Sequence, residues 1–442
     1  MCRSDDLDDA DDRADRGADQ GSDPSAPHAR WVRIRGQSID VSNFEHPGGS
    51  VIKFFHGLDG TAAFQSFHGH SKAAQYTLLS LPALDLPEDE AACGQPEAHA
   101  KAMMEAVASW RLRGLFQPRP LATAAYGAIV VGAVALSVAL APARPVAAGL
   151  LCGVAWAHCG FLQHMGGHYS MGSHSIAWQH FFEGLLKGGS ASWWRGRHNK
   201  HHAKTNVIGE DGDLRTTPFF AWDPTLARLL PDWSLRTQAF TFLPALAAYV
   251  FVFAFTVRKY ALLRRAWVEF ALMLAHYALF AAALAAAGCS PREGAAFYAV
   301  GYAAQGVYLG FFFGLSHFAA ERVPRTASWL QCTMHGTLNW SGSSALAGYA
   351  SGFLNVQIEH HMAPQMPMQN LRLIRDDCRA IAAAHGLPYR ELSFGAAVRH
   401  MLGGLHATGR AELARRADRE RFSAAGAYAA AAGAVLGDLK AD

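Results

Sequence analysis

The stretch VAAGLLCGVAWAHCGFLQHMGGH, residues 146–168, decides the fold because an apolar run leads directly into a pair of histidines. The apolar part, residues 146–162, approaches the roughly 20 residues that an α-helix needs to cross a bilayer. His164 and His168 stand four residues apart, so they share one face of a helix. The sequence therefore predicts a membrane-spanning helix that presents two imidazoles at its end.

Four other apolar runs of similar length predict an all-α body embedded in a membrane. They cover residues 121–141, 236–257, 266–288 and 295–316. Of the 442 residues, 51% are hydrophobic and 17% are charged, whereas an ordinary soluble domain has about 25% charged residues. The seven cysteines are odd in number and form no CxxC motif. This composition argues against a single soluble globule, a disordered protein and a secreted disulfide scaffold.

Two further histidine clusters lie just outside apolar runs. RHNKHH occupies residues 197–202 and QIEHH occupies residues 357–361. In both, residues three and four apart share a helical face, so each cluster can direct its imidazoles at one centre. The candidate histidines of the three clusters are His164, His168, His198, His201, His202, His360 and His361.

These imidazoles predict a centre with two iron ions. They outnumber the four ligands of a tetrahedral zinc site, whereas two six-coordinate metals would use them. Imidazole is a suitable ligand for iron. A zinc hydrolase is the chemical rival, but it normally needs a water-activating carboxylate such as the Glu of HExxH, and the sequence has no HExxH.

A single centre limits how the chain can cross the membrane. If the clusters meet on one face, the chain crosses an even number of times between residues 202 and 360, and one of the three intervening runs does not span. We expect this to be the run 236–257. It contains Pro244 and is followed by basic residues that favour the cytoplasmic side, namely Arg258, Lys259, Arg264 and Arg265. About four crossings result, with both termini in the cytoplasm.

The segment before the apolar runs contains a second pair of histidines. His46 stands in the turn His46-Pro-Gly-Gly49, where little bulk surrounds the imidazole and a flat macrocycle can approach. His68 and His70 follow some twenty residues later, and either one would supply an opposite axial ligand. A haem with two axial ligands has no open coordination position, which suits electron transfer rather than oxygen binding.

The composition divides the chain into five parts. We expect a disordered acidic tail over residues 1–29 and a small α+β haem-binding head over 30–90. A linker with an amphipathic helix follows over 91–120, then the membrane body over 121–395 and a cytoplasmic helix or tail over 396–442. Residues 1–30 hold nine Asp against four Arg. The positive residues are scattered elsewhere, so no nucleic-acid partner is expected.

The head resembles a cytochrome b5 domain, through the HPGG turn, the block Asp59-Gly-Thr-Ala-Ala-Phe64 and the following Phe67-His68. This resemblance implies haem b held by His46 and His68, with His70 as the alternative second ligand. The usual Tyr before Asp-Val is Ile39 here.

A b5 head followed by HxxxH, HxxHH and QxxHH between apolar runs resembles the front-end fatty acyl desaturases. That resemblance implies a di-iron centre held by the seven histidines above, with His317 as a further ligand and Gln357 as either a ligand or a donor to a ligand. The implied partners are a fatty acyl lipid or acyl-CoA, O2, membrane lipid and an NAD(P)H-dependent cytochrome b5 reductase. The implied location is the endoplasmic reticulum, and Trp193 and Trp194 are expected to mark the headgroup level.

The expected reaction is the insertion of a cis double bond between an existing double bond and the carboxyl end, at Δ5 or Δ6. The alternatives are a Δ4 or Δ8 desaturase, a sphingolipid long-chain-base desaturase or a hydroxylase on the same scaffold. A b5-like electron carrier would need only one membrane run and no histidine clusters. Met165 replaces the acidic residue usual after the first histidine, and Met362-Ala-Pro364 replaces the usual Leu-Phe-Pro, which leaves substrate choice open.

Overall fold

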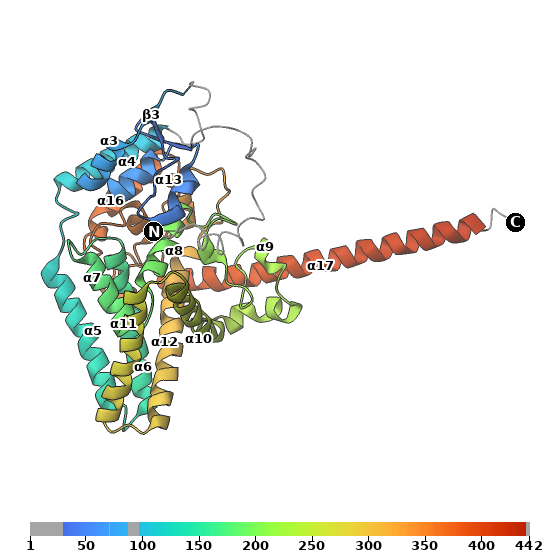
Figure 1. Cartoon of the computed structure of the whole chain (residues 1–442). Coiled ribbons are helices and arrows are strands. Elements are labelled where there is room, and N and C mark those ends of the chain that lie inside the picture. The colour runs from blue at the N-terminus through green and yellow to red at the C-terminus, as the bar shows by residue number, and fades with distance from the viewer. Residues whose placement is uncertain (1–29, 70, 87–96, 439–442) are drawn as a thin grey trace.

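The computed structural model describes residues 30–69, 71–86 and 97–438, with the backbone alone for 422–438. Figure 1 shows a small head at the top, a bundle of long helices that extends downward from it, and a C-terminal helix that projects to the side. The acidic tail predicted for residues 1–29 and the alternative haem ligand His70 lie outside the described residues.

The head combines a short antiparallel sheet with helices. Alternation of apolar residues forms its core, in which Val32, Ile34, Ile39 and Val41 are buried. Strand order in the sheet is β1-β2-β3. The elements of the head are β1 (Trp31–Ile34), β2 (Gln37–Asp40), η2 (Gly49–Phe55), α2 (Thr61–His68), α3 (Lys72–Ser80) and β3 (Ala83–Leu84).

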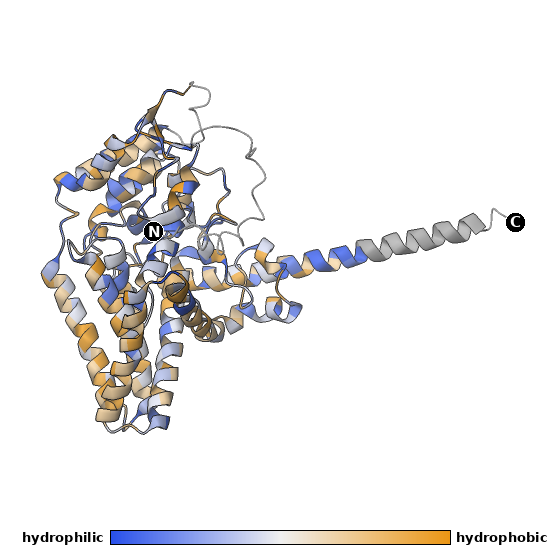
Figure 2. Ribbon diagram, in the orientation of Figure 1, coloured by the Kyte–Doolittle hydropathy of each residue, from blue (hydrophilic) through white to orange (hydrophobic). Residues whose placement is uncertain are grey.

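All five apolar runs form helices that are long and apolar enough to cross a membrane. Prolines stand in the first turn of three of them (α5, α6 and α12), where the missing N–H costs nothing. Figure 2 shows hydrophobic colour along much of the bundle. The five helices are α5 (Pro120–Leu140), α6 (Pro145–Gly167), α10 (Asp232–Leu263), α11 (Trp267–Ala286) and α12 (Pro291–His317). An α+β head on an all-α body is thereby confirmed.

Helix α10 differs from the other four in its direction. In Figure 1, α5, α6, α11 and α12 run side by side, whereas α10 lies across the upper part of this bundle. It contains Pro244 and packs against α12 and the C-terminal helix α17 (Phe394–Asp438). Its length and composition alone make it a candidate span, so the expectation that the run 236–257 does not cross the membrane stays a prediction.

Close contact between α6 and α12 brings two histidine-bearing helix ends together. A Cβ on Gly153 of α6 would lie 2.5 Å from the carbonyl oxygen of Gly301 on α12, so only glycine allows this approach. Small residues at helix crossings allow such a close approach of the backbones in membrane proteins. The upper ends of the two helices carry His164 and His317.

Shorter elements cover the end of the bundle next to the head. The helix α8 (Ala191–Ala203) carries the second histidine cluster, and Ser190 caps its N-terminus. Glu269 of α11 accepts a hydrogen bond from Ser192 N at 2.8 Å. The long bundle therefore anchors the start of this helix. The shorter elements include α4 (Glu97–Leu112), α7 (Ser175–Gln179), η3 (His180–Leu186), α8 (Ala191–Ala203), η4 (Gly212–Leu214), α9 (Pro224–Ala227), α13 (Trp329–Gly336), β4 (Asn339–Trp340), α14 (Ala345–Ala350), α15 (Gln357–Met362), η5 (Leu371–Ile374), α16 (Arg375–Ala384) and β5 (Glu391–Leu392).

Candidate metal centre and haem site

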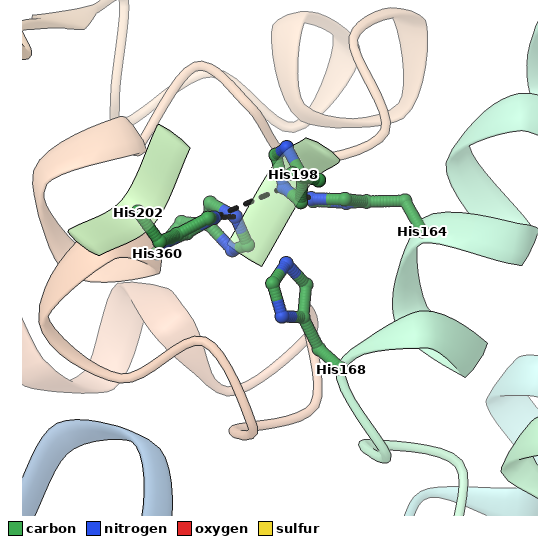
Figure 3. A group of neighbouring side chains, drawn as sticks. All are labelled: His164, His168, His198, His202 and His360. Atoms are coloured by element: carbon green, nitrogen blue, oxygen red, sulfur yellow. Dashed lines mark hydrogen bonds between the residues drawn. The ribbon is translucent and has the colours of Figure 1, made fainter. Parts of the chain in front are cut away.

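Five buried imidazoles meet between α6, α8 and α15, and we call them the five-histidine group. Their ligand atoms all lie within 4.8 Å of one another. Figure 3 shows the rings converging from the three helices. The group consists of His164, His168, His198, His202 and His360.

The nitrogen separations in this group match those of ligands around one metal ion. The Nε2 atom of His198 lies 2.9 Å from that of His164 and 3.0 Å from that of His202. The Nε2 atoms of His202 and His360 are 3.1 Å apart. With metal–nitrogen bonds of about 2.0–2.1 Å, ligands at right angles stand about 2.9 Å apart and tetrahedral ligands about 3.3–3.4 Å apart. These nitrogen atoms are therefore close enough together to bind one metal ion.

A second set of buried ligands lies beside the first, and we call it the three-histidine group. It contains His201, His317 and His361, whose ligand atoms also lie within 4.8 Å of one another. Gln357 Nε2 is 2.9 Å from His317 Nε2, and Gln357 Oε1 is buried without a hydrogen-bond partner among the described residues. Turning the amide would present that oxygen to the same point, since the two amide atoms are interchangeable in assignment.

Each imidazole of the three-histidine group is held through its Nδ1 atom. His201 Nδ1 lies 2.8 Å from Asp211 Oδ2, and His361 Nδ1 lies 3.0 Å from Thr205 Oγ1. His317 Nδ1 lies 3.2 Å from the carbonyl oxygen of Gly336. Such outer partners fix the ring orientation and leave Nε2 for a metal.

The electrostatics of the site keep most of its imidazoles in the form that binds metal. Burial and the neighbouring imidazoles hold the pKa values of His198, His202, His360 and His361 well below the usual histidine range. Burial also lowers the pKa of His201, but Asp211 and Asp213 raise it overall. Neutral imidazoles bind a cation without first losing a proton.

Unpaired buried nitrogens indicate that the two groups fit metal ions. His168 Nε2 and His361 Nε2 are both buried without a hydrogen-bond partner within the described part of the chain. A buried polar atom without a partner costs about 1–3 kcal/mol. Metal ions bound by the two groups would supply the missing partners of these two nitrogen atoms. Imidazole nitrogens are suitable donors for such ions.

Replacing Asp211 with Asn is expected to weaken metal binding about 10–100-fold, because loss of an outer-shell partner typically has that effect. The substitution keeps the shape of the side chain but removes the charge that supports His201. Iron retention during titration with a chelator measures the change. Asp232→Asn is the matched control, since Asp232 is exposed and pairs with Arg416. Equal iron retention by the D211N and control variants would contradict the assigned role.

The two histidines of the head face each other across a gap suited to a single metal atom. The ring centroids of His46 and His68 are 5.9 Å apart, with 60° between the ring planes. The ring centroid of Phe44 lies 6.0 Å from that of His46, and the ring centroid of Phe64 lies 5.4 Å from that of His68. A Cβ on Gly48 would lie 2.8 Å from the His46 ring, so a larger residue there would displace this ring. The geometry fits the axial ligands of a haem.

A cavity of about 200 Å³ runs between the histidines and the bundle. Its lining includes the side chains of Trp194, His198, His201, Leu246, Phe313 and His317. Trp194 stacks on His198 with ring centroids 4.3 Å apart, and Trp193 also lines the cavity. The two tryptophans therefore line the cavity, and their expected place at the headgroup level stays a prediction.

The sequence patterns do not indicate two residues that support the site. Asp211 and Thr205 each hold a histidine from outside the helical spacings that define the clusters. Trp194 stands four residues before His198, and that spacing was a signal for their shared face. Met165, in the position of the usual acidic residue, is buried in an apolar cluster.

Two family models match the chain. The model for fatty acid desaturases matches residues 139–393, and the model for cytochrome b5-like haem/steroid-binding domains matches residues 21–107.

Several curated desaturases are similar over most of their length. An acyl-lipid (8-3)-desaturase of Thraustochytrium sp is 30% identical over 413 residues, which cover 86% of this chain and 92% of the relative. A Delta(5) fatty acid desaturase of Caenorhabditis elegans is 26% identical, covering 81% of this chain and 91% of the relative. A Delta(8)-fatty-acid desaturase of Arabidopsis thaliana is 27% identical, covering 82% of this chain and 86% of the relative.

Proposed function

The chain belongs to the fatty acid desaturases that carry a cytochrome b5-like domain, the front-end group, and from this we propose the reaction and its residues. It is an oxidoreductase that acts on acyl lipids. We propose that it inserts a cis double bond between an existing double bond and the carboxyl end of a polyunsaturated chain. The observation that carries this proposal is that two buried histidine groups border one apolar cavity.

In this proposal the two histidine groups bind one iron ion each. The five-histidine group holds the first, and His201, His317 and His361 hold the second with help from Gln357. Bound iron supplies the redox chemistry that an acyl C–H bond requires, since this bond is neither acidic nor polarised. The nitrogen spacing and the unpaired buried nitrogens support the assignment.

The overall reaction needs electrons from outside the acyl chain. Two hydrogen atoms leave adjacent carbons, and together with two electrons and two further protons they reduce O2 to two molecules of water. We assign the delivery of these electrons, one at a time, to the head through haem b at His46 and His68. An NAD(P)H-dependent cytochrome b5 reductase would supply them.

The chain's own contribution is to position the substrate and exclude water. Leu246, Val250 and Phe313 give the cavity an apolar wall next to His198 and His317. An acyl chain in this cavity would therefore lie with one stretch against the histidines. Either a phospholipid or an acyl-CoA would present such a chain.

We further propose a multi-pass protein of the endoplasmic reticulum with four crossings, by α5, α6, α11 and α12, and both termini cytoplasmic. The shared direction of these four helices supports this arrangement (Figure 1). The basic residues at the end of α10, such as Arg258 and Lys259, favour the cytoplasmic side. In this arrangement α10 lies in the interface.

For the position of the new double bond we propose Δ5 or Δ6. The relative named as a Delta(5) desaturase supports Δ5, and the relatives named as 8-desaturases make Δ8 the competing outcome. Expression in yeast fed single C18 or C20 polyunsaturated precursors, followed by gas chromatography of the fatty acids, tests the proposal. A new cis bond on the carboxyl side of an existing one is expected. A hydroxylated product, a modified sphingolipid base or no new product would contradict it.

Narrowing the far end of the cavity is expected to select against longer chains. Gly306 beside Val250 stands eleven residues before His317, or about 16 Å along α12. Adding extra side-chain volume to a packed site costs about 1–3 kcal/mol, and each 1.4 kcal/mol corresponds to a tenfold change. Val250→Trp should therefore lower the conversion of C20 chains about tenfold relative to the conversion of C18 chains.

The ratio of C20 to C18 products in fed yeast measures this effect. Val252→Trp is the matched control, because Val252 is 49% exposed on the outer face of the same helix. An unchanged ratio in V250W, or the same shift in V252W, would mean that the cavity does not hold the far end of the chain.

A further inference from the structure

The haem-binding head is packed directly onto the elements that carry the histidine groups. Ala62 and Ala63 of α2 belong to the same buried apolar cluster as Ile358 and Met362 of α15. On another side of the head, η2 is in contact with α8. The helix that ends in His68 therefore shares a core with the helix that carries the third histidine cluster.

Further contacts hold the head in this position. Ser66 Oγ donates a hydrogen bond to the backbone carbonyl of His361 at 3.4 Å. Arg111 of α4 donates to the carbonyl of Gly69 at 3.0 Å, immediately after α2. Ser66 and Gly69 lie within two residues of His68, and the carbonyl that accepts from Ser66 belongs to His361 itself. The end of α2 is therefore fixed relative to the metal centre.

One side chain lies between the two sites. Phe67 is half-buried, and its ring centroid lies 6.0 Å from that of His202 in an edge-to-face contact. The same ring lies 6.3 Å from that of His68. A single aromatic ring thus packs near both a proposed haem ligand and a proposed iron ligand.

We propose that Phe67 is a positioning residue for electron delivery: it holds His68 and His202 at a fixed short separation and closes the gap that an electron must cross between them. This inference rests on the proposed function, in which the head supplies the electrons. With haem and metal bound, each transfer would move one electron, so that the haem iron would pass from ferrous to ferric while the metal centre would gain one electron. No bond is made or broken in this step, and the reductase restores the ferrous haem.

The physical reason is proximity. Electron transfer through protein weakens steeply with each gap in packing, and a ring in contact with both imidazoles leaves no such gap. A leucine in place of Phe67 would fill less of the space and would free the end of α2 to shift. Misplacement by about 1 Å can cost an assembled site about a hundredfold in rate.

The test measures how fast the reduced haem is reoxidised. The purified full-length protein is reduced without oxygen and is then mixed with O2 and a polyunsaturated acyl substrate, and haem absorbance reports reoxidation in a stopped-flow instrument. Phe67→Leu should slow reoxidation about tenfold or more, since the fixed geometry is lost. Phe67→Tyr, which keeps the ring, should stay near the wild-type rate. Tyr76→Leu removes an exposed ring from the same head and is the control.

The haem spectrum and reduction potential of each variant show whether the head itself is intact. If Phe67→Leu does not retain haem, Phe67→Met takes its place, because it keeps more of the volume without a ring. Reoxidation of the ringless variant at the wild-type rate would overturn the role of Phe67, as would equal slowing in Phe67→Tyr.

A parallel measurement separates this inference from the proposed function. His201→Ala should reoxidise slowly even though Phe67 is present. If wild-type haem reoxidises no faster than the haem of H201A, the head does not feed this centre, and the proposed function itself is wrong.

Discussion

Replacing His201 with alanine is expected to abolish formation of the new double bond while the haem spectrum stays unchanged. His201 belongs to the three-histidine group, and Asp211 orients its ring. Loss of an outer-shell partner costs about 10–100-fold, and loss of a ligand should cost more. The haem site should not change, because its proposed ligands, His46 and His68, lie in the head.

Gas chromatography of fed yeast and the absorbance spectrum of the purified protein measure the two sides of this prediction. His174→Ala is the matched control, since His174 is exposed and lies outside both histidine groups. The control should form product at the wild-type level. Product from H201A at that level would show that the histidine groups do not carry out the reaction.

Replacing His46 with alanine is expected to give the opposite pattern, with loss of haem and retention of non-haem iron. His46 provides one of the two facing imidazoles of the head, 5.9 Å from His68 between ring centroids. Without axial ligation on both sides the haem should be lost, and with it the entry point for single electrons. Desaturation should then fall to background when the reductase and NAD(P)H are the only source of electrons.

The measurements are haem absorbance, non-haem iron content and product formation in a reconstituted assay. His56→Ala serves as the control, because His56 lies in the same head but not in the facing pair. Wild-type product formation by H46A in this assay would contradict the assignment of the head as the electron donor.

Much of the fold could be predicted from the sequence because its signals are local. Apolar runs of span length predicted five helices, and each forms within a few residues of the expected bounds. Helical spacing predicted which face each histidine cluster presents, and these faces meet in two groups. The small sheet of the head agrees with the α+β head expected from the sequence.

The remainder depends on contacts between distant parts of the chain. Asp211 reaches His201 from ten residues away through a turn, a distance that no helical periodicity indicates. Phe67 contacts His202 only because the head packs against the body. The division of the ligands into a group of five and a group of three likewise follows from how α6, α8, α12 and α15 pack, not from the motifs themselves.

Metal analysis of the purified full-length protein distinguishes a two-iron centre from its alternatives. Two non-haem iron ions per chain are expected in addition to one haem iron, with both non-haem ions bound by the two histidine groups. A single zinc ion per chain, or no metal beyond the haem iron, would contradict a two-iron centre and with it the proposed desaturation chemistry.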